Sequence, residues 1–441
     1  MNLIRRITAR EILDSRGNPT LEVEMDCDKC IARASVPSGA STGSHEACEL
    51  RDADPKRYHG KGVLKAAENV NGTIRNAFFQ KDVDLMSQRE FDTLLLELDG
   101  TPQKTTLGAN AMLGCSLAFA KAKAYSQSVS LYRYAMSLST VPCAIDAERF
   151  VLPTPMVNIL NGGVHASSGL EIQEFMVIPA DFPTATDAVR AASEIFHTLK
   201  GLLAKAGFTT SVGDEGGFAP TLKDNDEALS YIVQAIEASG YKAGQQVFIA
   251  LDCAASEYYD AGKSTYSLKV EGQKRDLDSA QLAQYYSSLM AKYPILSIED
   301  PFAEDDWDGF SRFMANLPRK VQVVGDDLFV TQSNRVQKGI NLSAANALLV
   351  KLNQVGTVTE TIDAVNLAQK NKWGTIMSNR SGETEDTYLV DFAIGFGTGQ
   401  IKTGSMSRGE RIVKYNQLLR IEEREGDKAM YAGKKAFMHL L

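Results

Sequence analysis

The segment VFIALD at positions 247–252 sets the expected fold of the second part of the chain, because it is a short apolar run that ends on an acid. Similar runs lie on both sides of it, and most are separated by helical patterns such as 278–292, 357–369 and 408–423. The runs cover positions 175–178, 247–251, 295–298, 321–324, 347–350, 374–377 and 400–401. Repeated strand–helix units of this kind predict a parallel β/α barrel. A doubly wound open sheet is the alternative, weakened because no glycine-rich dinucleotide fingerprint follows any run.

The first part of the chain has a different order of elements. Positions 21–25 alternate apolar and polar residues, as a half-buried antiparallel strand does, and 108–127 is rich in Ala, Leu and Lys, which favours a helix. Strands followed by helices indicate an α+β domain. We therefore expect an α+β domain over 1–140 and a barrel domain over 141–441, packed directly against each other because no flexible linker separates them.

Composition restricts the partners and the compartment. The chain has 441 residues, 44% of them hydrophobic, and a net charge of −8, which argues against nucleic acid as a general partner. No apolar run approaches the length of a membrane span, and no secretory signal is visible at the N-terminus. Six cysteines in a chain of this length fit free thiols in a reducing cytoplasm. The lone C-x-x-C of Cys27 and Cys30 is interpreted as two thiols in a turn between strands.

Charged residues follow the predicted strands where each one ends. Three of them are acids, Asp252, Glu299 and Asp326, and two are lysines, Lys351 and Lys402. A single acid in such a place commonly pairs with a cation or caps a helix, but five charges at successive strand ends favour a site. In a barrel they would converge on the C-terminal mouth. Three carboxylates brought together repel one another, and a hard divalent cation resolves this, so they are candidate Mg²⁺ ligands.

The two lysines and three loops are the remaining candidates. A lysine beside cations has a lowered pKa and can act as a base, so Lys351 or Lys402 could take a proton while the other binds an anion. Arg380 and Ser381 offer donors suited to a phosphate. Glu215 lies between glycines that let the backbone approach a ligand closely. The small-residue loop 38–43 either closes over a ligand or is a plain flexible connection.

Taken together, these motifs resemble the enolase family over essentially the whole chain. The similar segments are 14–19, 38–43, 161–163, 173–176, 213–220, 251–255, 297–301, 325–330, 380–386, 400–404 and 414–418. The resemblance implies an N-terminal α+β domain followed by a modified TIM-type β/α barrel, usually in a homodimer. It also implies reversible, Mg²⁺-dependent dehydration of 2-phosphoglycerate to phosphoenolpyruvate in glycolysis and gluconeogenesis. Such an enzyme is cytoplasmic, although an additional cell-surface or secreted pool without a signal peptide stays open.

The resemblance also implies a role for each site residue. Two Mg²⁺ ions are expected per active site, one on the three carboxylates and a second that arrives with substrate and takes Ser41 as a ligand. Lys351 would remove the C2 proton, and Glu215, with Glu174 beside it, would help the C3 hydroxyl to leave. The substrate would be bound by the side chains of His165, Glu174, Lys351, Asn379, Arg380, Ser381 and Lys402: Lys402 would hold its carboxylate, Arg380 and Ser381 its phosphate, and His165 would lie on a loop over it.

One position departs from the family pattern. Enolases resemble one another at Ser-His-Arg-Ser-Gly-Glu-Thr, whereas this chain has Asn379 in place of the histidine. An amide still donates a hydrogen bond but carries no charge, so we expect weakened but surviving activity. Two alternatives stay open: an enolase-like synthase acting on a phosphonate analogue, and a non-catalytic role as a scaffold or surface receptor.

Overall fold

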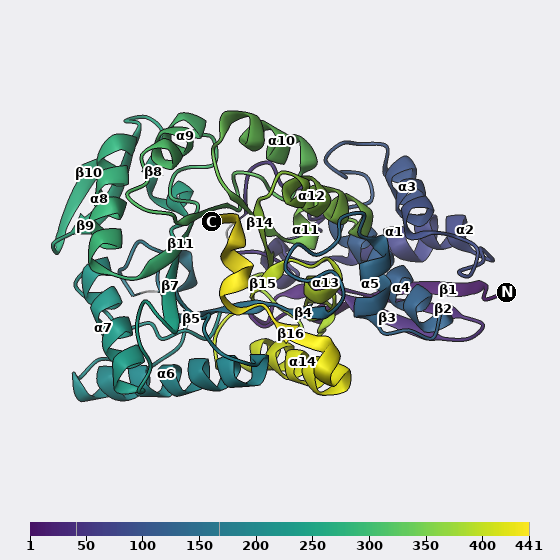
Figure 1. Ribbon diagram of the computed structural model, residues 1–441. Coiled ribbons are helices and arrows are strands. Elements are labelled where there is room, and N and C mark those ends of the chain that lie inside the picture. The colour runs from purple at the N-terminus through teal and green to yellow at the C-terminus, as the bar shows by residue number, and fades with distance from the viewer. Residues whose placement is uncertain (41, 167, 441) are drawn as a thin grey trace.

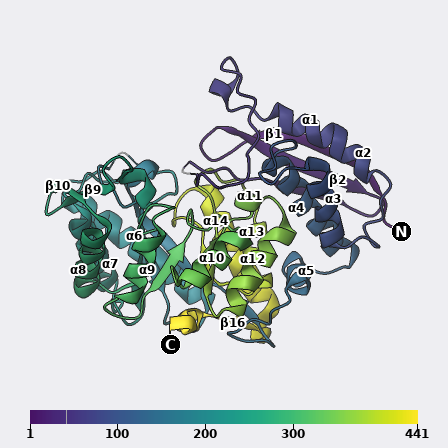
Figure 2. The same ribbon diagram turned by 90° about the horizontal axis from the view of Figure 1, so that it is seen from above.

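The computed structural model describes residues 1–40, 42–166 and 168–440, and it has two parts (Figure 1). An antiparallel sheet with its helices forms the N-terminal part, and a closed barrel surrounded by helices forms the rest. The view from above separates the two parts clearly (Figure 2). The fold is therefore an N-terminal α+β domain followed by a TIM-type barrel, as the sequence predicts.

The N-terminal sheet has the strand order β1-β2-β3. In β2, Leu21, Val23 and Met25 are buried, which confirms the predicted alternation. Cys27 and Cys30 are free buried thiols at the turn between β2 and β3, also as predicted. The elements are β1 (Ile4–Leu13), β2 (Pro19–Cys27), β3 (Ile31–Ser35), η1 (Tyr58–Gly60), α1 (Leu64–Asn69), the π-helical η2 (Val70–Ile74), α2 (Arg75–Phe78), α3 (Gln88–Asp99), α4 (Ala109–Ser126) and α5 (Leu131–Leu138).

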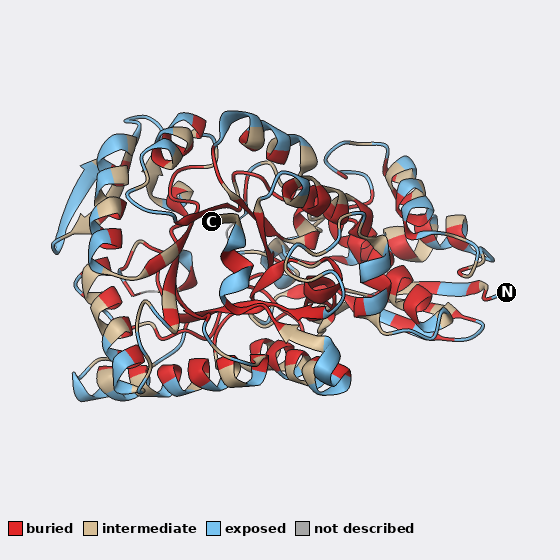
Figure 3. Cartoon of the chain, viewed as in Figure 1, coloured by how far each residue is buried: buried red, intermediate tan, exposed pale blue. Residues whose placement is uncertain are grey.

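The barrel closes in the order β11-β12-β13-β14-β15-β5-β6-β7. Its strands are the most uniformly buried part of the chain, with exposed residues concentrated on the surrounding helices (Figure 3). The strands are β5 (Thr154–Asn161), β6 (Glu174–Pro179), β7 (Val247–Asp252), β11 (Ile295–Glu299), β12 (Gln322–Gly325), β13 (Ala347–Val350), β14 (Gly374–Ser378) and β15 (Gly399–Lys402).

The expectation of an all-parallel barrel is wrong at one strand. β6 runs antiparallel to both β5 and β7, while the other neighbouring strands are parallel. The start of β6, at Glu174, therefore lies beside Asp252 at the end of β7. β5 was not predicted as a strand, because Pro155, Asn158 and Asn161 interrupt its apolar pattern, yet all of its residues are buried.

The helices of the barrel begin where the sequence predicts. The side chain of Asp278 caps α8 and that of Thr357 caps α12, so both helices start directly after a residue that can accept an orphan backbone N–H. The helices are α6 (Ala185–Lys205), α7 (Asn225–Ala238), α8 (Ser279–Lys292), α9 (Trp307–Ala315), α10 (Ser333–Leu342), α11 (Leu352–Val355), α12 (Val358–Lys370), α13 (Tyr388–Gly395) and α14 (Gly409–Glu425).

The C-terminal segment covers the end of the barrel where the strands begin. Thr154 Oγ1, at the start of β5, donates to the Gly433 carbonyl, and Gln400 Nε2 donates to the Ala436 carbonyl. Both carbonyls belong to η6 (Gly433–Leu440), which crosses the barrel in Figure 1. The smaller elements are β4 (Phe150–Leu152), η3 (Gly163–His165), η4 (Ala255–Tyr258), β8 (Tyr259–Asp260), β9 (Thr265–Val270), β10 (Gln273–Leu277), η5 (Gly426–Lys428) and β16 (Ala429–Tyr431). Among the described residues, no helix combines the length and the apolar character that crossing a membrane requires.

Candidate active site

A small cavity at the opposite end of the barrel brings together most of the predicted site residues. Because the parallel strands all end there, their last residues face one another, as do the loops that follow them. Two predicted ligands are not among its lining residues but contact its lysines: Glu299 contacts Lys402 and Asp326 contacts Lys351. Ser41 lies outside the described residues. The lining residues are His165, Gln173, Glu174, Glu215, Asp252, Lys351, Ser378, Asn379, Arg380, Ser381 and Lys402.

Lys402, the last residue of β15, is the centre of the buried charge. Its Nζ lies 2.9 Å from Asp252 Oδ2 and 2.9 Å from each carboxylate oxygen of Glu299. It also lies 3.4 Å from Glu174 Oε2. Burial opposes the charge of Lys402, but Asp252, Glu174 and Glu299 outweigh it and raise its pKa well above the ordinary value. Lys402 is thus firmly cationic.

Lys351, which follows β13, pairs with the third predicted ligand. Its Nζ donates to Asp326 Oδ2, while Gln354 Nε2 donates to Asp326 Oδ1 at 2.8 Å. The expected lowering of the lysine pKa is not found: burial lowers the pKa of Lys351, but Asp326 raises it more. The sequence argument assumed cations around this lysine, and the carboxylate that it contacts has the opposite effect.

The three carboxylates form a donor set that suits a hard cation. Asp252, Glu299 and Asp326 are all buried and offer only oxygen, which Mg²⁺ prefers. Burial and the nearby charge of Asp252 raise the pKa of Glu299 well above its usual range, so this cluster needs positive charge to stay ionised. In this structure the two lysine ammonium groups supply that charge. The chemistry of these donors suits the predicted magnesium ion; among the described residues, the all-carboxylate group whose ligand atoms lie within 4.8 Å of one another is Asp300, Asp326 and Asp327.

Asp300 directly follows Glu299 at the end of β11, and the sequence pattern alone does not show that the two acids have different contacts. Its carboxylate accepts the backbone N–H of Asp326 at 2.9 Å and that of Asp327 at 2.7 Å. These bonds fix the turn that follows β12. Asp300 consequently positions Asp326, and Glu299 is the member of the pair that contacts Lys402.

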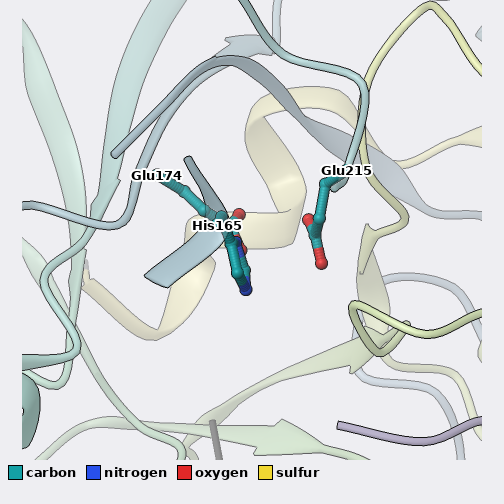
Figure 4. A group of neighbouring side chains, drawn as sticks. All are labelled: His165, Glu174 and Glu215. Atoms are coloured by element: carbon teal, nitrogen blue, oxygen red, sulfur yellow. The ribbon is translucent and has the colours of Figure 1, made fainter. Parts of the chain in front are cut away.

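His165, Glu174 and Glu215 form a second group (Figure 4), and all three line the same cavity. One ligand-type atom of each lies within 4.8 Å of the others, and all three side chains are buried. His165 Nδ1 lies 3.5 Å from Glu174 Oε1. His165 comes from η3 and Glu174 from the start of the antiparallel strand, whereas Glu215 lies on the glycine-bounded turn. The structure thus brings these three predicted residues together.

The two glutamates of this group have opposite pKa shifts. Burial and the charge of Glu215 raise the pKa of Glu174 well above its usual range. Burial also opposes ionisation of Glu215, but His165, Arg411 and Lys402 outweigh it and lower its pKa to about 2. Two carboxyl groups whose pKa values are pushed apart can hold one proton at neutral pH, as acid–base chemistry requires. The directions of the two shifts favour protonation of Glu174 over Glu215.

Asn379, the position that departs from the family pattern, contacts the acid–base group. Its Nδ2 donates to Glu215 Oε1 at 3.1 Å and to its neighbour's carbonyl, Arg380 O, at 3.1 Å. The Asn379 side-chain oxygen is buried and has no hydrogen-bond partner among the described residues. The amide therefore contacts Glu215 in this structure, while the Arg380 guanidinium pairs with Glu46.

Arg380 and Ser381 lie on a loop held between the two domains. The Arg380 guanidinium makes a two-pronged ion pair with Glu46, both distances being 3.0 Å, and donates to Asn353 Oδ1 at 3.0 Å. Burial lowers the pKa of Arg380, but Glu46 raises it by more. Ser381 Oγ accepts the backbone N–H of Ala40 at 2.7 Å. The predicted phosphate loop thus depends on residues of the first domain.

Several site residues were not singled out from the sequence. Gln173 Nε2 donates to Asp252 Oδ2 at 3.1 Å, and Asn158 Nδ2 lies 3.5 Å from Glu215 Oε2. Gln173 lies in a segment that carries the family resemblance, which was the available signal. Glu46 and Asn353 gave none, because each becomes part of the site only through a contact with Arg380, Glu46 from the other domain and Asn353 from α11 of the barrel.

Two family models match the chain. The model of the enolase N-terminal domain matches residues 4–135, and the model of the enolase C-terminal TIM barrel domain matches residues 149–440. The two matches follow the division into an antiparallel sheet with helices and a closed barrel, and together they cover nearly the whole chain. The chain belongs to the enolase family.

Proposed function

We propose that this protein catalyses the reversible, Mg²⁺-dependent dehydration of 2-phosphoglycerate to phosphoenolpyruvate, as a carbon–oxygen lyase of glycolysis and gluconeogenesis. One observation carries the proposal. A single cavity joins a buried group of carboxylates and lysines to a carboxyl pair with separated pKa values and to the Arg380–Ser381 loop. These are the parts needed to remove a proton beside a carboxylate, to release a hydroxyl and to hold a phosphate.

Lys351 is the proposed base and Lys402 the proposed carboxylate-binding cation. Lys351 donates to the Asp326 carboxylate, which raises its pKa. It would take the C2 proton as the neutral amine, and a cation held by Asp326 would lower the lysine pKa toward that form. Lys402 is firmly cationic and suits an anion that stays charged throughout the reaction. When bound by Asp252, Glu299 and Asp326, Mg²⁺ supplies charge neutralisation, which offsets these carboxylates and stabilises the second negative charge that develops on the substrate carboxylate. The second Mg²⁺ and its ligand Ser41 stay predictions.

Glu174 and Glu215 are proposed to deliver the proton that the departing C3 hydroxyl needs. Burial raises the pKa of Glu174, while His165, Arg411 and Lys402 lower that of Glu215, so a proton shared by the pair is favoured on Glu174. Asn379 and Asn158 orient the Glu215 carboxylate by one contact to each oxygen. His165 lies beside Glu174 and lines the same cavity, which fits a residue covering the substrate.

The assembly and the domain boundary are part of the proposal. We place the boundary between residues 140 and 141, after α5 and before β4. A homodimer and a cytoplasmic location follow from membership of the family, and the substrate is a small phosphorylated acid. The phosphonate alternative depended on Asn379, but that amide donates to Glu215, so it gives no reason to prefer a phosphonate.

Exchange of the C2 proton tests the proposed chemistry separately from dehydration. With 2-phosphoglycerate and Mg²⁺ in D₂O, the wild-type protein should incorporate deuterium at C2, followed by NMR. Lys351→Ala should abolish the exchange, while Glu215→Gln should keep it and lose phosphoenolpyruvate formation. Exchange that persisted in Lys351→Ala would reject Lys351 as the base.

A further inference from the structure

The hydroxyl of Ser381 has only one hydrogen-bonding role left. Ser381 is buried, and its Oγ accepts the Ala40 N–H at 2.7 Å and the Arg16 Nη1–H at 3.4 Å. A serine hydroxyl has two lone pairs and one proton. Both lone pairs are used, so the hydroxyl can only donate, and no described residue accepts its proton. A buried donor that lacks an acceptor indicates a ligand oxygen at this position.

Arg16 is fixed by contacts that leave its charge beside Ser381. Its Nη2 lies 3.3 Å from Asp14 Oδ2, 3.2 Å from the Ser38 carbonyl oxygen and 3.3 Å from that of Gly39. Asp14 Oδ1 accepts the backbone N–H of Arg16 at 2.8 Å, which holds the turn around it. The Nε–H of Arg16 is buried and has no partner within the described ranges. One ion pair with Asp14 accompanies these contacts, so the guanidinium has donors to spare.

The backbone explains why an arginine of the first domain can approach this loop of the barrel. Ser38 and Gly382 form an antiparallel bridge, and Ser15 N–H donates to the Glu383 carbonyl at 2.8 Å. A Cβ at Gly382 would lie 2.5 Å from Arg16 Nη2 and 2.7 Å from the Ser38 carbonyl oxygen. Glycine at this position is what allows the close contact.

We infer that Arg16 is a positioning residue of an anion subsite: with Ala40 it occupies both lone pairs of Ser381 and so commits the hydroxyl to donation. Such a hydroxyl, beside Arg380, selects a ligand with acceptor oxygens and negative charge, namely a phosphate or phosphonate group. The reaction served by this subsite rests on the proposed function, whereas the binding of the anion does not.

Isothermal titration with inorganic phosphate, in the presence of Mg²⁺, tests this inference. Arg16→Gln should weaken phosphate binding about 5-fold, and Ser381→Ala about 10-fold, as expected for loss of a charge-assisted hydrogen bond. Arg5→Gln, which removes an arginine paired with Asp28 on the same domain, is the matched control and should leave binding unchanged. Thermal melting of each variant separates loss of binding from loss of folding.

The double variant distinguishes positioning from a general structural effect. If Arg16 acts through Ser381, then Arg16→Gln should weaken binding in the wild-type background but hardly at all in the Ser381→Ala background. Equal losses in both backgrounds, or no phosphate binding by the wild-type protein, would overturn the inference. Turnover of 2-phosphoglycerate by the wild-type protein is measured in parallel. Phosphate binding without turnover would reject the proposed function but not the anion subsite.

Discussion

The two halves of the candidate site are built in different ways. The proposed metal and proton-transfer half consists of Asp252, Glu299 and Lys402 at strand ends, with Asp326 and Lys351 directly after the ends of theirs. The phosphate half consists of loop residues, Arg380 and Ser381, which are held by Glu46, Ala40 and Arg16 of the other domain. The first half is fixed by one barrel, whereas the second exists only while the two domains stay in contact.

Because of this difference, we expect the two halves to respond differently to substitutions. Strand ends are held by the hydrogen-bonded barrel, so changes there should alter charge and chemistry without moving the backbone. The phosphate loop is held by contacts between distant segments, so changes there should alter binding geometry. Four variants test this contrast, beginning with the largest expected effect.

Lys351→Ala should remove most of the activity. Loss of a general base costs about 10²- to 10⁴-fold in rate, and here the lysine is also part of the buried charge balance with Asp326. Steady-state formation of phosphoenolpyruvate measures the effect. The matched control is Lys200→Ala on the exposed side of α6. A loss of less than about 10-fold, roughly one tenth of the smallest expected loss, would reject the assignment.

Glu299→Gln should remove the stabilisation that Mg²⁺ gives. A cation that binds only the folded protein stabilises it by about 2.7 kcal/mol at 100 times its Kd. Thermal melting with and without Mg²⁺ should show a clear shift for the wild-type protein and little for the variant. Glu97→Gln on α3, an exposed carboxylate, is the control. An unchanged Mg²⁺ shift in Glu299→Gln would contradict the three-carboxylate site.

Gly382→Ala should damage the phosphate half alone. The new Cβ would lie 2.5 Å from both Arg16 Nη2 and Asp14 Oδ2, and such overpacking costs about 1–3 kcal/mol. We expect a raised KM for 2-phosphoglycerate and an unchanged affinity for Mg²⁺. Gly409→Ala is the matched control, because a Cβ there meets no atom within 4 Å. A parallel loss of Mg²⁺ affinity would show that the halves are not independent.

Asn379→His should have the smallest effect. It would exchange a neutral donor to Glu215 for one that can carry charge, a change of about 1 kcal/mol, or 5- to 10-fold in kcat/KM. We expect kcat/KM to increase, because a charged donor stabilises the Glu215 carboxylate more strongly than a neutral one. An unchanged kcat/KM would show that Asn379 costs this protein nothing.

The convergence of the strand-end charges that form the proposed metal half could be predicted from the sequence for a simple reason. Each of its residues follows a short apolar run, and the geometry of a barrel brings strand ends together without any further information. Glu174 does not follow a strand. Because β6 is antiparallel, its first residue, rather than its last, lies at the mouth of the barrel beside Asp252. That residue was expected only from the family resemblance. The strand β5 was missed for a different reason: Pro155, Asn158 and Asn161 interrupt its apolar pattern, although all of its residues are buried.

The phosphate half could be predicted only in part. Arg380 and Ser381 were expected, but their partners were not, because Glu46 is 334 residues away from Arg380 in the sequence. No local pattern encodes which distant carboxylate a guanidinium will meet. The direction of the Lys351 pKa was wrong for a related reason, since it depends on Asp326 being in direct contact. Pairings between elements are set by the packed structure.

Formation of phosphoenolpyruvate from 2-phosphoglycerate, measured in a coupled assay with Mg²⁺ and again with EDTA, tests the central claim most directly. The proposed function predicts turnover with Mg²⁺, none with EDTA, and recovery when Mg²⁺ is restored in excess. Turnover that persisted in EDTA, or no turnover under either condition, would contradict it.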